Sequence, residues 1–250
     1  MRNSALAWLL MSTLVVVGLW DGWRELKAQG ADLLPILYVR IEGVFQYITK
    51  DEVIQAVLKQ VMNGFLNADV QVIRQSLLSL PWIAQVNVKR IWPDAIEIRV
   101  YEQYPVARWG QIGLLNAQGD LFIPPNLAKF NQLPLLNGPL GQEKKLVEWM
   151  KQLQTTLAKQ SLAFTELTIN DRRAWTVILS NQIELKLGRK DPLEKLQHFL
   201  PTVPILGAER IAAITAVDLR YPNGYAVTWK AGSKPTEWQS RTVNSSIEAR

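Results

Sequence analysis

An uninterrupted apolar run near the start of the sequence constrains this chain more than any other feature. It extends from Ala5 to Trp20 (ALAWLLMSTLVVVGLW), carries no charge, and is bounded by Arg2 and Asp21. Counted with the preceding serine, the run has about 17 residues, which as a helix span roughly 25 Å, slightly less than the hydrocarbon core of a bilayer at about 30 Å. We therefore predict a single transmembrane helix within residues 1–23, with its short positive end in the cytoplasm.

Two alternatives for this run stay open. A cleaved signal peptide begins in the same way, and a short apolar stretch also suits a buried core helix. However, the small residues Ala28 and Gly30 come only after Arg24, Glu25 and Lys27, so no cleavage pattern follows the run closely. This spacing favours a retained anchor. Residues 24–36 are then a juxtamembrane stalk, in which Pro35 interrupts any helix.

The bulk composition limits the classes of protein that the rest of the chain can belong to. Most of the 250 residues lie beyond the apolar run, which suits two small domains better than one large core. The absence of cysteine excludes a disulfide framework, a thiol nucleophile and cysteine metal sites. The net charge is +6, but Lys and Arg are scattered among Asp and Glu. We interpret this charge as a mixed solvated surface and expect no nucleic-acid partner.

Residues 37–104 predict a compact α+β domain. Residues 37–44 alternate as a strand, and Thr49 with Glu52 forms a capping box that opens a helix. The apolar stripe of that helix is Val53, Ile54, Val57, Leu58 and Val61. A second apolar stripe at helical spacing begins near Asn67 or Asp69 and stops at Pro81. Two alternating strands complete the segment, Ile83–Ile91 and Ile96–Val100. The order β-α-α-β-β predicts a pair of helices on one face of a small sheet.

Residues 105–230 are richer in strands and are expected to form a second, strand-rich domain with two helices. The strands are predicted at 107–109, 113–116, 121–123, 133–136, 164–169, 175–179, 183–187, 215–221 and 225–229, and the helices at 142–157 and 191–200. Pro222-Asn223-Gly224 predicts a chain reversal before the last strand. Residues 231–250 are polar, and we expect them to be disordered.

The sequence contains no recognisable catalytic or metal motif. There is one histidine, His198, on a predicted helix, and a single imidazole does not supply a two-histidine metal site. No Gly-rich phosphate loop follows a strand, and no serine lies in a nucleophile elbow. We therefore expect no enzymatic activity, no cofactor and no metal.

Several local stretches resemble one known family. They are LPWIAQVNVKRIWPD (80–94), EIRVYEQYPVARW (97–109), DRRAWTVILSNQIELKLGR (171–189) and VDLRYPNGYAVTW (217–229). Together with the order of parts, they are similar to the matching stretches of the FtsQ/DivIB family of bacterial cell-division proteins, over about residues 37–230. The resemblance implies a divisome scaffold of the inner membrane, mostly periplasmic and enriched at the septum, with a POTRA domain at 37–104 and an FtsQ-type β domain at 105–230.

The resemblance also implies partners and contact residues. In the family, the POTRA domain helps to localise the protein in connection with FtsK, and the β domain binds the FtsB–FtsL pair, with FtsB adding along the last strand. Carried onto this chain, the partner-binding residues are Arg173, Arg220, Tyr221, Asn223, Gly224, Tyr225, Thr228 and Trp229. Two of these, Tyr225 and Thr228, are bulkier than the small residues often found at the matching places.

The residues themselves support the same mechanism. The final strand of a domain often lies at a sheet edge, where unpaired main-chain groups can accept another strand. Tyr221, Tyr225 and Trp229 are amphipathic aromatics of the kind that anchor interfaces, and Arg173 or Arg220 is suited to a partner carboxylate. The alternative is that the three aromatics only pack the core. Two other functions stay open: a POTRA-containing secretion or assembly factor that receives client peptides, and a secreted hydrolase freed by signal cleavage.

Overall fold

The computed structural model describes residues 34–222 and 224–233, and it divides into two compact units between Tyr104 and Pro105, each with its own hydrophobic core. The predicted transmembrane helix at Ala5–Trp20, the stalk up to residue 33, Asn223 and the tail from residue 234 lie outside the described residues. Within the described ranges, no helix combines the length and the apolarity needed to cross a bilayer.

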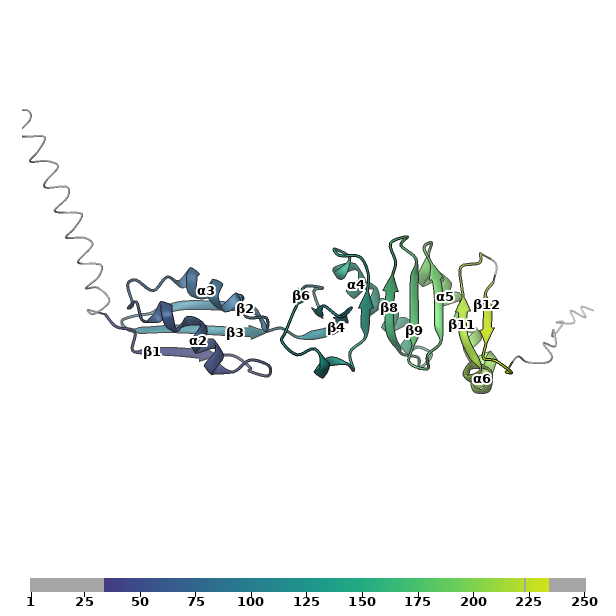
Figure 1. Ribbon diagram of the computed structural model, residues 1–250, viewed down its shortest axis with the longest axis horizontal. Coiled ribbons are helices and arrows are strands. Elements are labelled where there is room, and N and C mark those ends of the chain that lie inside the picture. Colours follow the sequence, from purple (N-terminus) through teal and green to yellow (C-terminus); the bar gives the residue numbers. More distant parts are fainter. Residues whose placement is uncertain (1–33, 223, 234–250) are drawn as a thin grey trace, which may run out of the picture. The chain divides into compact units, whose positions relative to one another are not determined.

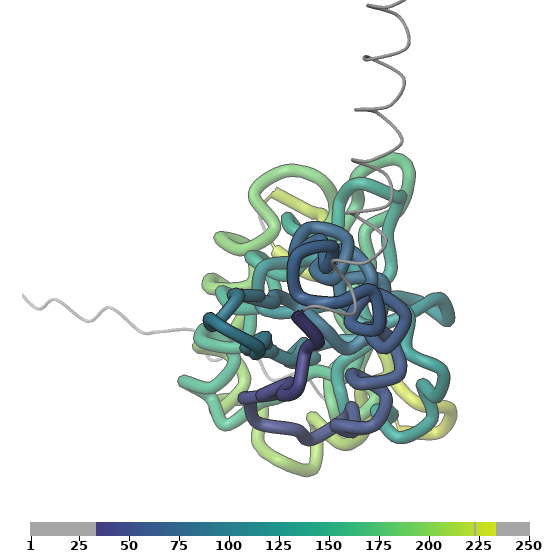
Figure 2. The backbone as a smooth tube through the Cα atoms, turned by 90° about the vertical axis from the view of Figure 1, so that its left-hand side faces the viewer, coloured from purple at the N-terminus to yellow at the C-terminus, as the bar shows by residue number. Residues whose placement is uncertain are grey.

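The first unit is a three-stranded sheet with two helices on one face (Figure 1). The central strand β3 pairs in parallel with β1 and antiparallel with β2, and Figure 2 traces this part of the backbone in purple and blue. The elements are β1 (Tyr38–Glu42), α2 (Lys50–Val61), α3 (Val70–Leu78), β2 (Ile83–Ile91) and β3 (Ala95–Glu102). The predicted β-α-α-β-β order is confirmed.

Local sequence signals begin both helices of this unit. The capping box predicted before α2 is present: the Thr49 hydroxyl accepts from the backbone N–H of Glu52, whose carboxylate accepts from the backbone N–H of Thr49. Asp69 caps α3 by accepting from the backbone N–H of Gln71 at 2.7 Å. Each cap satisfies amides that the first helical turn leaves without partners.

The second unit is built on a nine-stranded sheet in the order β12-β11-β10-β9-β8-β7-β4-β5-β6. Helix α4 packs over β8 and α5 over β10, and the buried side chains of these helices form one core with the strands. The strands are β4 (Pro105–Trp109), β5 (Gly113–Asn116), β6 (Leu121–Phe122), β7 (Leu135–Asn137), β8 (Phe164–Ile169), β9 (Trp175–Leu179), β10 (Glu184–Gly188), β11 (Ile214–Asp218) and β12 (Ala226–Trp229). The helices are η1 (Ala128–Phe130), α4 (Glu143–Ala158), α5 (Pro192–Phe199) and α6 (Thr202–Ala212).

Two predictions about the second unit were wrong. The unit holds a third α-helix, α6, which the sequence analysis missed because Pro204 and Gly207 interrupt its pattern; Gly207 has φ +75° and kinks the helix. The strand predicted at 215–221 ends instead at Asp218. It ends there because the Asp218 carboxylate accepts the backbone N–H of Arg220 at 3.0 Å, which turns the chain.

Candidate functional site

Strand β12 lies at one end of the nine-stranded sheet and pairs only with β11 among the described strands. The carbonyl of Thr228 accepts from the Thr215 hydroxyl at 3.1 Å, and the N–H of Lys230 donates to the carbonyl of Ala213 at 2.8 Å. Alternate residues of a strand direct their main-chain groups to opposite sides. The N–H and C=O groups of Val227 and Trp229 therefore point away from β11, along the outer edge of the sheet.

The side chains of β12 divide between two faces. Val227 and Trp229 are half-buried and pack against the core, whereas Ala226 and Thr228 are exposed on the other face. The alternative of core packing therefore holds in part for Trp229. An edge strand of this kind keeps its side chains in the core while its outer main-chain groups remain accessible to another chain.

The strand register brings most of the predicted partner-binding residues to one end of the sheet. Trp175 at the start of β9 pairs with Gly188 at the end of β10, and Asp218 at the end of β11 pairs with Ala226 at the start of β12. Arg173, Arg220, Tyr221, Gly224 and Tyr225 lie in the turns at this end. Thr228 and Trp229 lie along β12 itself. At about 4.8 Å between neighbouring strands, the turn that carries Arg173 is about 15 Å from β12.

Arg220 is held by its own chain. Its Nε donates to Oδ1 of Asp218 at 2.8 Å, and the pairing lowers the pKa of Asp218, chiefly through this side-chain hydrogen bond. The aliphatic part of Arg220 lies against Gly188, where an added Cβ would come within 3.0 Å of Arg220 Cγ. The guanidinium is therefore positioned before any partner arrives, although part of its charge is already compensated.

Arg173 has a different environment from Arg220. It occupies the tight turn between β8 and β9 with φ +60°, and Asn170 closes that turn by accepting from the backbone N–H groups of Arg172 and Ala174. The exposed guanidinium of Arg173 makes no ion pair with a described residue. It is therefore the less compensated of the two predicted arginines.

The tyrosines lie beside a cleft that the sequence analysis missed. The ring of Tyr225 meets Phe199 of α5 edge to face, with 5.1 Å between centroids, and Tyr221 is 56% exposed. The described lining of this cleft, whose volume is about 260 Å³, consists of Lys195, His198, Phe199, Leu219, Tyr221, Pro222, Gly224 and Tyr225. Lys195, His198 and Phe199 are spaced at i, i+3 and i+4, which places them on one face of α5. This spacing is the part of the cleft that the sequence alone indicates.

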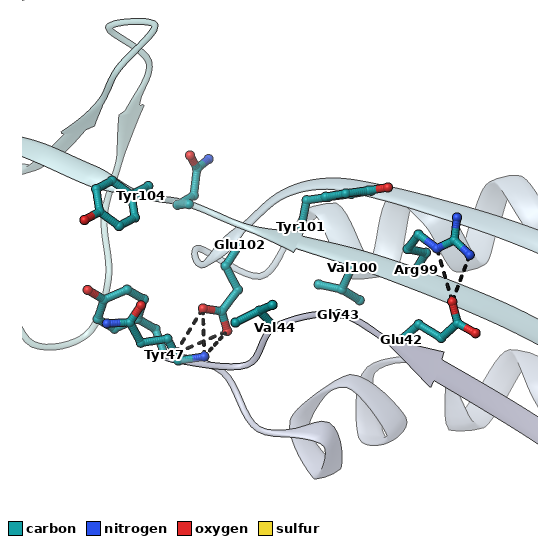
Figure 3. Close-up of a pocket in the computed structure, with 11 residues that line it drawn as sticks. Glu42, Gly43, Val44, Tyr47, Arg99, Val100, Tyr101, Glu102 and Tyr104 are labelled. Atoms are coloured by element: carbon teal, nitrogen blue, oxygen red, sulfur yellow. Dashed lines mark hydrogen bonds and ion pairs between the residues drawn. The ribbon is translucent and has the colours of Figure 1, made fainter.

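A second hollow, of about 450 Å³, lies in the first unit where β3 continues beyond the end of β1. Figure 3 shows the carboxylate of Glu102 turned toward the loop after β1, where it accepts from the backbone N–H groups of Gln46, Tyr47 and Ile48 at 3.0–3.2 Å. The figure also shows Arg99 paired with Glu42. Nη2 of Arg99 lies 2.8 Å from Oε2 of Glu42. The hydrogen bonds of Glu102 therefore hold the loop at residues 46–48 beside this hollow.

No cluster of three or more His, Cys, Asp or Glu residues with metal-binding geometry occurs among residues 34–222 and 224–233. Strand β12 and the turns beside it bring together outward-pointing main-chain groups, aromatic rings and cations.

Comparison with known proteins assigns both units. The family described as "Cell division protein FtsQ/DivIB, C-terminal" matches residues 107–220, and "POTRA domain, FtsQ-type" matches residues 34–103. Cell division protein FtsQ of Methylomonas methanica is 44% identical over 94% of this chain and 95% of its own length. The FtsQ proteins of Escherichia coli K12 and Coxiella burnetii are 34% and 33% identical, over 88% and 79% of this chain and 82% and 81% of their own lengths. With these matches across both units, the chain belongs to the FtsQ/DivIB family of cell-division proteins.

Proposed function

We propose that this chain is a non-enzymatic scaffold of the divisome that binds the FtsB–FtsL pair by strand addition to β12. The observation that carries the proposal is the outer edge of β12, where the main-chain groups of Val227 and Trp229 point away from the sheet. A partner strand laid along this edge gains main-chain hydrogen bonds, and pockets for its side chains add specificity.

The side chains near the edge support the same role. Tyr221 is exposed in the turn after β11, and Trp229, on β12 itself, is half-buried. Aromatic residues of this kind dominate the binding energy of many interfaces. Arg173 and Arg220 supply cations at the same end of the sheet, and a partner carboxylate accepts a forked hydrogen bond from either one. Arg220 lies near the added strand, whereas Arg173, about 15 Å from β12, meets a part of the partner beyond that strand.

The proposal extends to the membrane and to midcell. Residues 1–23 form a single transmembrane anchor, the stalk at 24–36 follows it, and the POTRA domain at 37–104 and β domain at 105–230 lie in the periplasm. The apolar, uncharged run Ala5–Trp20 supports this topology. Through its POTRA domain the protein joins FtsK, and through β12 it joins FtsB–FtsL, so that it links early and late division proteins at the septum.

A proline at the outer edge tests the proposed binding mode. Val227→Pro removes an N–H that points away from β11, so the internal ladder between β11 and β12 is retained. We expect this variant of the full chain to lose at least tenfold in affinity for the purified FtsB–FtsL pair. The matched control is Val227→Ala, which loses a comparable part of the side chain but keeps the N–H, and which is expected to bind within about threefold of the wild type. Equal binding by both variants, each shown to be folded by circular dichroism, contradicts strand addition.

A further inference from the structure

Three segments of the first unit meet at the end of its sheet where β1 begins. The backbone N–H of Leu37 donates to the carbonyl of Asp94 at 2.8 Å, and that of Phe65 donates to the carbonyl of Leu34 at 2.8 Å. The ring of Trp92 meets that of Phe65 edge to face, with 4.7 Å between centroids. The entry to β1, the loop after α2 and the turn between β2 and β3 therefore lie together. Figure 1 shows the start of β1 and this turn at the same end of the unit.

Large apolar side chains are exposed on all three segments. Trp92 is 67% exposed although one part of its ring contacts the buried Phe65. The exposed large side chains of these segments, here called the entry patch, are Leu37, Tyr38, Met62, Leu66, Ile91 and Trp92. A single exposed apolar side chain is ordinary on a protein surface, whereas several gathered at one end of a small domain mark an interaction surface.

The place where the chain enters the first unit indicates what covers the entry patch. The uncharged apolar run Ala5–Trp20 ends about 17 residues before Leu37. Even a fully extended chain of that length spans no more than roughly 60 Å. A tether this short keeps the patch at a high local concentration beside the bilayer that holds the run, so a weak contact is sufficient. Because β1 and β3 are parallel, β3 ends at the opposite end of the sheet, away from the patch.

The chemistry of the entry patch suits a membrane interface. Trp and Tyr are the residues that gather at the level of the lipid headgroups, where one part of the ring is apolar and another is wet. The next row on the open face of the sheet consists of Arg40, Glu97 and Lys89, and Asp94 is half-buried in the turn. Positive and negative side chains are thus nearly balanced. Apolar and aromatic side chains, more than net charge, therefore drive the contact.

We propose that the entry patch lies in the headgroup region of the lipid bilayer, so that the first unit rests with the start of β1 against the membrane. Trp92, Tyr38 and their apolar neighbours enter the interface, and the end of β3 points away from it. This inference rests on the proposed transmembrane anchor and is independent of strand addition to β12. The lipid contact gives the first unit a fixed orientation on the membrane, which a flexible tether alone does not supply.

A fluorescent probe on a single introduced cysteine tests this contact, because the chain contains no cysteine of its own. The probe is placed at Tyr38→Cys, and the matched control is Val44→Cys, which is 84% exposed and lies beyond the other end of β1, roughly 20 Å away. The full chain with either probe is reconstituted into phosphatidylethanolamine–phosphatidylglycerol vesicles that contain a lipid with a nitroxide quencher near its headgroup. We expect quenching about threefold stronger at residue 38 than at residue 44, because only residue 38 lies at the interface.

Removal of the patch provides a second test. Leu37→Ser combined with Leu66→Ser, in the chain with the probe at Tyr38→Cys, is expected to lower the quenching to the level of the Val44→Cys probe. The matched control is Ile54→Ser combined with Leu78→Ser, which removes two exposed apolar side chains from the helices outside the patch and is expected to leave the quenching unchanged. Circular dichroism shows whether each variant is folded.

The outcomes separate this inference from the proposed function. Equal quenching at residues 38 and 44, in a chain that alkaline carbonate does not release from the vesicles, overturns the lipid contact and leaves the anchor in place. Release of the chain by carbonate contradicts the anchor itself, and the inference falls with it. A blue-shifted probe at residue 38 that the nitroxide lipid does not quench, and whose shift disappears when the protein is diluted with lipid, assigns the patch to a second copy of this chain and also overturns the inference.

Discussion

Asp218 accepts hydrogen bonds from the backbone N–H of Arg220 at 3.0 Å and from its guanidinium, through Nε at 2.8 Å and Nη2 at 2.5 Å. The first bond turns the chain out of β11, and the bonds to the guanidinium fix its position, while Gly188 at the end of β10 leaves room for the aliphatic part of Arg220. One carboxylate thus ends the strand and orients a cation that the family resemblance assigns to partner binding.

The first prediction concerns the pH dependence of stability. The hydrogen bond from Arg220 lowers the pKa of Asp218 below its usual value of about 3.9. Its contribution to stability is therefore complete above about pH 4 and is lost as the pH falls through the lowered pKa. Asp218→Asn should lower the free energy of unfolding by about 1 kcal/mol at pH 7 and by less at pH 2–3. Urea unfolding of the full chain at both pH values measures this difference, and a cost independent of pH contradicts it.

The second prediction concerns Glu102. Its carboxylate accepts three backbone N–H groups from residues 46–48, and hydrogen bonds to a charged group are worth more than neutral ones. Glu102→Gln should therefore destabilise the first unit by about 1.5–3 kcal/mol. Glu42→Gln is the matched control, because it breaks only the exposed pair with Arg99 and should cost less than about 1 kcal/mol. Hydrogen exchange at the amides of residues 46–48 reports both effects, and an equal loss of protection in the two variants would show that the carboxylate does not order this loop.

The third prediction separates an interface side chain from one that also packs the core. Tyr221 is 56% exposed, so Tyr221→Ala should weaken binding of FtsB–FtsL by more than about 1 kcal/mol without lowering the melting temperature. Trp229 packs partly against the core, so Trp229→Ala should lower both affinity and stability. Calorimetry and binding measurements on the same preparations test this contrast. A loss of stability in Tyr221→Ala equal to that in Trp229→Ala would place Tyr221 in the core.

The fourth prediction concerns the glycine beneath Arg220. Gly188 has φ +77°, and a Cβ there would come within 3.0 Å of Arg220 Cγ. Gly188→Ala should therefore destabilise the second unit by about 1–2 kcal/mol and also weaken partner binding, because it displaces the guanidinium. Gly141→Ala is the control: its φ is +85°, but nothing lies within 4 Å of its added Cβ, so it should affect stability alone. Unchanged partner affinity in Gly188→Ala would show that the position of Arg220 does not matter for binding.

The first unit could be predicted closely from sequence because its signals are local. The capping box of Thr49 and the cap of Asp69 begin helices at the expected places, and period-two alternation gives β2 its observed bounds. The stripe expected on α2 was only partly correct: Val53 and Val57 are buried, whereas Ile54 and Leu58 are exposed. The side of a helix that meets the sheet depends on tertiary packing, which the pattern does not specify.

The second unit shows where such signals end. Apolar and polar residues continue to alternate from Thr215 to Tyr221, but β11 ends at Asp218, whose carboxylate accepts the backbone N–H of Arg220. Strand propensity does not detect such a hydrogen bond between a side chain and the main chain. The cleft beside α5 was missed for a related reason, since it requires α5 to meet the turn before β12, and these segments lie over twenty residues apart in sequence. The edge position of β12 was anticipated from its place as the last strand, and the sheet order agrees with this. The partner-binding residues stay a prediction.

The most direct test of strand addition is amide hydrogen exchange at Val227 and Trp229 in the full chain, measured alone and with the purified FtsB–FtsL pair. The account predicts rapid exchange at both amides in the free chain and strong protection in the complex, while the amide of Lys230, which donates to Ala213, is protected in both states. Protection of Val227 and Trp229 in the free chain, or no change when the partner binds, would contradict the account.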